Sequence, residues 1–123
     1  MSKDHIGSGW IGVDLDGTLA KYETWQGIHS IGEPIPAMVQ KVKEAINRGF
    51  TVKIFTARAC AGQPYRNVAI RYVQDWAEKH IGIRLEVTAE KDFSCIQIWD
   101  DRAKEVIHNV GEFVLTVGDC DVP

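Results

Sequence analysis

One stretch near the start of the chain decides the fold: Trp10-Ile11-Gly12-Val13-Asp14-Leu15-Asp16-Gly17-Thr18-Leu19. Its first four residues form a short apolar run typical of a buried strand, and two carboxylates, a glycine and a hydroxyl residue follow. Side chains alternate along a strand, so Asp14 and Asp16 can share one side where the strand gives way to a loop. Gly17 allows a sharp turn there and the close approach of a ligand. Two carboxylates in this position repel each other unless a cation or a proton offsets their charge, so the stretch predicts a functional site rather than a charged turn.

The rest of the chain alternates between helical and strand patterns. Apolar residues at helical spacing follow Pro34 and Pro36 and stop at Gly49, and a second helical pattern covers about residues 64–79. Further strands are predicted at residues 50–56, 83–88, 95–99 and 113–117, and a third helix at about 103–110. This alternation predicts an α/β fold: a mainly parallel, Rossmann-like sheet of five strands with helices on both faces, in a three-layer sandwich.

Length, charge and composition limit the classes of protein that the chain can belong to. Its 123 residues predict a single domain, residues 1–123. The net charge of −3 argues against a dedicated binder of nucleic-acid backbones, which would carry a basic surface. No apolar run approaches the roughly 20 residues of a membrane span, and the N-terminus lacks the long apolar core of a signal peptide. Three cysteines without metal-type spacing fit a reducing compartment, so we expect a cytoplasmic protein.

Polar residues from distant parts of the chain are predicted to meet at one edge of the sheet. Ligands of such sheets bind outside the carboxyl ends of the strands, and these ends carry Asp14, Asp16, Thr56, Lys91, Asp100 and Asp101. Three or four carboxylates close together require a hard cation such as Mg²⁺, and zinc is disfavoured because no histidine or cysteine sits at these ends. Lys91 and Thr56 supply donors for the oxygens of an anion. The set indicates phosphoryl transfer.

The two carboxylates of the first stretch can divide the chemistry between them. Asp14, at the strand tip, is the candidate nucleophile, and its attack on phosphorus would form an aspartyl-phosphate. Asp16 is placed to protonate the leaving alkoxide and later to deprotonate water.

The same residues resemble the motifs of the haloacid dehalogenase (HAD) superfamily of phosphatases. Asp14-Leu15-Asp16-Gly17-Thr18 resembles the first motif, Thr56 the second, Lys91 the third and Asp100-Asp101 the fourth, in the family's order. The resemblance implies a Mg²⁺-dependent phosphatase with Asp14 as nucleophile and Asp16 as general acid/base. It further implies Mg²⁺ bound by Asp14, the Asp16 carbonyl and Asp100, with Asp101 assisting, and phosphate held by Thr56 and Lys91.

The residues around the second and third motifs leave alternatives open. Lys91 lies only nine positions before Asp100, a short interval for the superfamily, but Lys104 is a poor substitute because it falls within the predicted third helix. Ala57 and Arg58 join Thr56 as candidate substrate-binding residues. Arg58 is expected to contact the substrate, and its alternative role is a surface ion pair.

The intervals between the motifs are too short for the cap domain of larger members of the superfamily, so residues 20–33 form only a flap. Tyr22, Trp25 and His29 of this flap either lie over the site or pack on the body of the protein. An open site admits a phosphorylated small molecule or a nucleic-acid end, unless a neighbouring subunit of a homo-oligomer supplies the lid.

Two other functions use similar residues. A phospho-accepting signalling domain combines a parallel sheet with acidic residues, Thr and Lys, but its acidic pair lies near the start, whereas here Asp100-Asp101 follows Lys91. A non-catalytic HAD-like binding module would need no acid/base carboxylate beside the nucleophile.

Overall fold

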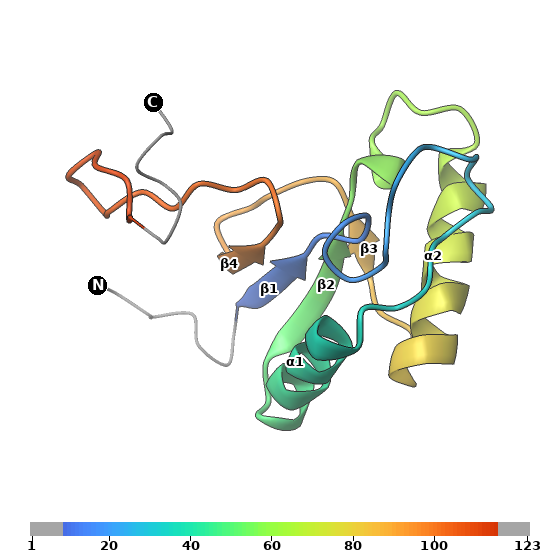
Figure 1. The fold of residues 1–123 in the computed structure, drawn as a ribbon, viewed down its shortest axis with the longest axis horizontal. Coiled ribbons are helices and arrows are strands. Elements are labelled where there is room, and N and C mark those ends of the chain that lie inside the picture. Colours follow the sequence, from blue (N-terminus) through green and yellow to red (C-terminus); the bar gives the residue numbers. More distant parts are fainter. Residues whose placement is uncertain (1–8, 116–123) are drawn as a thin grey trace.

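The fold is a four-stranded parallel sheet with two helices, described for residues 9–115 in a computed structural model (Figure 1). The strands are β1 (Trp10–Val13), β2 (Thr51–Phe55), β3 (Val87–Thr88) and β4 (Cys95–Trp99), and they lie in the order β3-β2-β1-β4. The helices are α1 (Pro36–Asn47) and α2 (Arg66–Ile81), and a short 3-10 turn, η1 (Ala57–Ala59), follows β2. Every strand pairing is parallel, so the prediction of an α/β fold is confirmed.

Single residues set the ends of both helices. Pro36 opens α1, where its missing N–H donor is not needed and its fixed φ already suits a helix. Gly49 and Gly82 follow the two helices at φ values of +93° and +94°, a left-handed conformation that glycine adopts without strain. α2 begins at Arg66 instead of residue 64 because Tyr65, at φ 58°, is not helical. Neither helix in the described part of the chain has the length and apolar character needed to cross a bilayer.

Both helices pack against one face of the sheet. This face presents alternate residues of the two central strands, Ile11 and Val13 from β1 and Val52 and Ile54 from β2. The helices bury side chains against them: Val39, Val42 and Ala45 of α1, and Val73, Trp76, Ala77 and Ile81 of α2. The parallel β1-α1-β2-α2-β3 path therefore shares one apolar core, and the carboxyl ends of its strands meet at one edge.

The opposite face of the sheet is covered by side chains of the strands themselves. The Trp10 ring is 3% exposed, with the Lys53 amine 4.6 Å and the Phe55 ring 6.4 Å from it. A Cβ on Gly12 would lie 2.9 Å from the Trp10 ring, so glycine is needed for the ring to lie across the strand. No helix of residues 9–115 covers this face, so the predicted three-layer arrangement is not confirmed.

The segment after β4 differs from its prediction. Residues 103–110 contain no helix, only a bridge at Val106 and a turn at residues 108–110, so the predicted third helix is wrong. The run is short for a helix and rich in β-branched residues, and Asn109 and Gly111 take positive φ. Its apolar side chains also stay exposed, so packing does not favour a helix there. The predicted fifth strand is absent over residues 113–115, where only Phe113 forms a bridge, to Val106; residues 116–117 lie outside the described residues.

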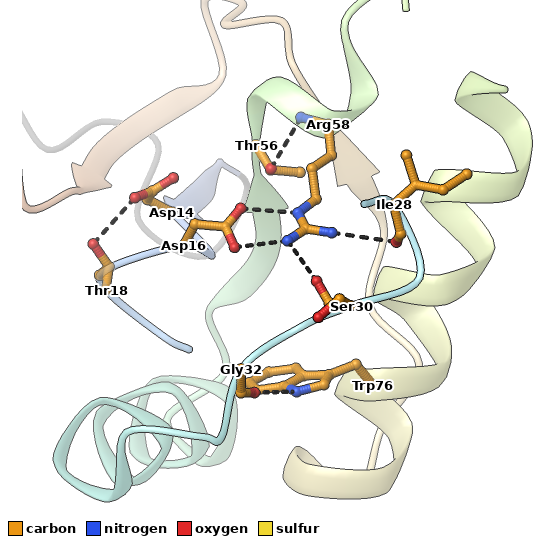
Figure 2. A network of polar contacts seen from close by, with 9 residues as sticks. All are labelled: Asp14, Asp16, Thr18, Ile28, Ser30, Gly32, Thr56, Arg58 and Trp76. Carbon is orange, nitrogen blue, oxygen red and sulfur yellow. Dashed lines mark hydrogen bonds and ion pairs between the residues drawn. The ribbon is translucent and has the colours of Figure 1, made fainter. Parts of the chain in front are cut away.

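The two ends of the flap (residues 20–33) are fastened side by side. The Lys21 N–H donates to the Glu33 carbonyl at 2.8 Å, and Ala20 forms an antiparallel bridge with Pro34. The buried Trp76 indole of α2 donates to the Gly32 carbonyl at 3.0 Å (Figure 2). The two ends of the flap are therefore held to each other, and Gly32 is held to α2.

Substitution of Gly32 tests this attachment. A Cβ at Gly32 would collide with the main-chain carbonyl oxygen of Lys21, which no side-chain rotation relieves. We expect Gly32→Ala to lower the free energy of unfolding by about 1–3 kcal/mol, measured by urea denaturation. The control is Gly62→Ala, where a Cβ meets nothing within 4 Å; we expect it to change stability by less than about 0.5 kcal/mol. Equal effects of the two substitutions would contradict the attachment.

Candidate functional site

The predicted site residues follow the carboxyl ends of three adjacent strands. Val13 pairs with Ile54 of β2 and with Trp99 of β4, and this register sets the next residues side by side. The Asp14 N–H donates to the Trp99 carbonyl at 2.9 Å, which fixes the start of the loop after β1. A cavity of about 540 Å³ opens at this edge, and its lining includes Asp14, Asp16, Thr56, Ala57, Arg58, Asp100 and Asp101. Seven of the eight predicted site residues therefore border one cavity.

Three of the carboxylates form a cluster. One carboxylate oxygen each of Asp14, Asp100 and Asp101 lies within 4.8 Å of the other two. The Thr18 hydroxyl lies 3.2 Å from an Asp14 oxygen and 3.1 Å from an Asp101 oxygen, so it can donate to either, and it accepts from the Asp101 N–H at 3.0 Å. Thr18 thus links the loop after β1 to the loop after β4. The sequence singled out Thr18 as part of a motif but not for this link.

Gly17 gives Asp101 the room that this cluster needs. Its φ is +91°, and a Cβ there would lie 2.7 Å from an Asp101 carboxylate oxygen. The sequence predicted that Gly17 allows a close approach; the group that approaches is a carboxylate of the chain itself.

The cluster is electrostatically unbalanced. Burial, the largest cause, and the neighbouring charge of Asp100 together raise the pKa of Asp14 from its ordinary 3.8 to about 7. A hydrogen bond from Thr18 lowers this pKa but does not offset the other effects. A bound cation would compete with the proton on Asp14, because it removes the same repulsion.

Asp16 points away from the cluster and toward Arg58 (Figure 2). The Arg58 Nε and Nη2 atoms donate to the two Asp16 oxygens at 2.8 and 2.9 Å, a bidentate pair with high geometric specificity. The Arg58 side chain is only 5% exposed. The alternative role of a surface ion pair is therefore wrong: the pair is nearly buried and forms part of the cavity wall.

Arg58 also fastens the middle of the flap to the site. Its Nη1 donates to the Ile28 carbonyl at 3.2 Å, and its Nη2 donates to the Ser30 carbonyl at 3.0 Å. The guanidinium carbon lies 4.8 Å from the centre of the Trp25 ring. The Arg58 main-chain N–H donates to the buried Thr56 hydroxyl at 3.2 Å, which orients Thr56 at the end of β2. Arg58 therefore joins the end of β2, Asp16 and the flap.

Lys91 is the predicted site residue that does not border the cavity. It is exposed in the loop between β3 and β4. Burial raises the pKa of the Cys95 thiol, and the charge of Lys91 acts on that thiol in the opposite direction. Lys104 lies elsewhere, with its amine 5.2 Å from the Phe113 ring. The cation that borders the cavity beside Arg58 is Arg102, whose N–H donates to Asp100 at 2.8 Å.

The three flap side chains divide between the two positions that the sequence left open. Tyr22 and Trp25 border the cavity and are 41% and 52% exposed. His29 instead contacts α2, with its ring 6.1 Å from that of Tyr72.

Comparison with models of known protein families and with curated proteins finds no match to the chain. The functional interpretation therefore depends on the geometry and the chemistry of this cavity.

Arg58 can be tested against a matched exposed pair. Arg58→Ala leaves a half-buried carboxylate and two carbonyls without their donor, so we expect a loss of about 3 kcal/mol in the free energy of unfolding. Arg84 makes ion pairs with Asp75 and Glu78 on the surface, where water screens the charges, so Arg84→Ala should lower stability far less than Arg58→Ala. Urea denaturation measures both. Similar losses for the two variants would show that the Arg58 ion pair contributes no more to stability than an exposed ion pair does.

The raised pKa of Asp14 predicts that protons and a divalent cation compete. Between about pH 4 and pH 7 the folded protein holds a proton on Asp14 that the unfolded chain has lost, so this group makes the protein less stable as pH rises. We expect MgCl₂ to raise the melting temperature more at pH 8 than at pH 5, measured by differential scanning fluorimetry. The variant Asp14→Asn has no titratable carboxylate at position 14, so this difference between the two pH values should largely disappear. An equal effect of MgCl₂ at both pH values would contradict the competition.

Proposed function

We propose that the chain is a Mg²⁺-dependent phosphomonoester hydrolase of the HAD type that works through an aspartyl-phosphate on Asp14. One observation carries the proposal: oxygens of Asp14, Asp100 and Asp101 gather within 4.8 Å in a cavity that Asp16 and Thr56 also line. The sequence resemblance to the superfamily, with all four motifs in order, adds to this support. Its substrate would be a phosphorylated small molecule or a nucleic-acid end.

The donor set fits a hard cation. Three carboxylate oxygens suit Mg²⁺, and the cluster contains neither histidine nor cysteine. Burial, and after it the charge of Asp100, raise the pKa of Asp14, so a bound cation would stabilise its ionised form. Asp14, Asp100 and Asp101 would hold the ion, which neutralises charge on the phosphate oxygens when bound.

The residues of the chain can then divide the reaction into two steps. An Asp14 oxygen attacks phosphorus, the bond from phosphorus to the ester oxygen breaks, and Asp16 gives its proton to the leaving alkoxide. Asp16 next takes a proton from water, which attacks the aspartyl-phosphate and releases phosphate and the free Asp14 carboxylate. Each Asp16 oxygen keeps a second lone pair beside its hydrogen bond from Arg58, and the transferred proton would be carried there once the carboxyl group turns toward the leaving group.

A non-catalytic cation-binding module is the second candidate, and the position of Lys91 favours it. A phosphatase of this type needs a lysine near the phosphate, yet Lys91 does not border the cavity. Arg102 borders it and can supply positive charge to the phosphate in place of Lys91. Binding of Mg²⁺ without any phosphate release would favour the module.

The test is phosphate release from p-nitrophenyl phosphate with and without MgCl₂. We expect turnover that requires the metal and that falls at least about a thousandfold in Asp14→Asn, because the nucleophile is removed. The matched control is Asp75→Asn, an exposed carboxylate on α2 that should leave turnover unchanged. Full turnover in Asp14→Asn, with the fold verified by circular dichroism, would remove Asp14 from this role.

A further inference from the structure

Two aromatic side chains of the flap form one wall of the cavity. Tyr22 and Trp25 border it with 41% and 52% of their surface exposed. Trp10 and Trp76, by contrast, are buried and donate their indole N–H groups to Asp92 and Gly32. Within the described part of the chain, the Trp25 indole N–H has no such acceptor. Trp25 therefore keeps a flat apolar surface and a hydrogen-bond donor available beside the carboxylates.

Arg58 links Trp25 to the candidate catalytic residues. The guanidinium of Arg58 lies over its ring at 4.8 Å, and Arg58 is itself held by both oxygens of Asp16 and by two flap carbonyls. Since the guanidinium covers one face of the indole, the other face remains for a ligand. A rigid aromatic wall loses little conformational freedom on binding, which favours affinity.

The cavity has more room than a phosphate group needs. Its volume of about 540 Å³ falls in the range of sites that hold drug-sized ligands. Besides the acidic cluster and Thr56, the lining contains five apolar or aromatic residues, Tyr22, Trp25, Phe55, Ala57 and Ala89, and five others, Asp16, Arg58, Cys60, Gln63 and Arg102. The cavity therefore offers aromatic and apolar surface for a flat ring and polar groups that can bind the edge of that ring.

We propose that the substrate carries a planar aromatic ring, such as a nucleobase, on the leaving-group side of its phosphate, and that Trp25 and Tyr22 recognise this ring by stacking. The inference depends on the proposed hydrolase function and specifies its substrate class. The ring can belong to a free nucleoside monophosphate or to the phosphorylated end of an oligonucleotide, because both place a base near a phosphate monoester.

The experiment compares phosphate monoesters of ribose with and without the base. Phosphate release from adenosine 5′-monophosphate and from ribose 5-phosphate is measured in the presence of MgCl₂, together with a 5′-phosphorylated oligonucleotide. We expect kcat/KM to be roughly 5- to 100-fold higher for the nucleotide than for ribose 5-phosphate, the range that base–aromatic stacking supplies. A preference for the oligonucleotide over the nucleotide would assign the ring to a strand end, and the reverse would assign it to a free nucleotide.

The variant Trp25→Leu separates recognition of the ring from a structural role of the indole. We expect the ratio of the two kcat/KM values to fall toward one in Trp25→Leu and to stay unchanged in Phe93→Leu. Phe93 is a fully exposed aromatic residue outside the cavity. A merely structural role would lower both values together and preserve the ratio, and this result would overturn the proposal.

Failure of the substrate class can be distinguished from failure of the hydrolase. Equal kcat/KM for ribose 5-phosphate and the nucleotide in the unaltered protein would overturn the ring proposal and leave the hydrolase intact. If no substrate releases phosphate, the hydrolase fails, and calorimetric titration of the unaltered protein with both compounds decides the ring proposal. Tighter binding of the nucleotide that is lost in Trp25→Leu would support it, and equal binding would overturn it.

Discussion

The mutual repulsion of three carboxylates, held together by the pairing of parallel strands, is the constraint on which the rest of this structure depends. Hydrogen bonds between β1 and β4 fix Asp14 beside Asp100, although the negative charges of the two side chains repel each other. Gly17 and Thr18 then bring Asp101 into the same space. The apolar core under α1 and α2 stabilises an arrangement that burial and charge oppose locally. Such local opposition is common at functional sites, where stability is lost in favour of chemistry.

Arg58 extends this arrangement beyond the strands. Its two hydrogen bonds to Asp16 hold the second carboxylate of the first motif apart from the acidic cluster. Its bonds to the flap carbonyls tie a segment without regular structure to β2. A movement of the flap middle would therefore disturb the contacts of Asp16, so access to the cavity and the position of this carboxylate are linked through a single side chain.

Local patterns in the sequence predicted most of the fold and the acidic part of the site. β1, α1, β2, α2 and β4 each have a clear apolar period and a residue that ends them, and the carboxylates follow directly from the strand ends. The segment 103–110 has a helical period too, but no partner surface for its apolar side chains, which periodicity alone does not reveal. The contact between Arg58 and Asp16 joins residues 42 positions apart. It also depends on the path of the flap, whose sequence has no regular hydrophobic pattern from which a structure could be predicted. The position of Lys91 was equally unpredictable, because it depends on the direction of a loop side chain.

The two ends of the flap lie side by side, and this affects which changes of sequence the protein can tolerate. Residues 20–33 leave and rejoin the body at neighbouring points, as in an Ω-loop, so their length is decoupled from the geometry of the sheet. The entropy of closing a loop grows only slowly with its length, so insertions at this point cost little stability. Changes of length or sequence in this one segment can therefore alter the entrance of the cavity without altering the strand ends that carry the acidic cluster.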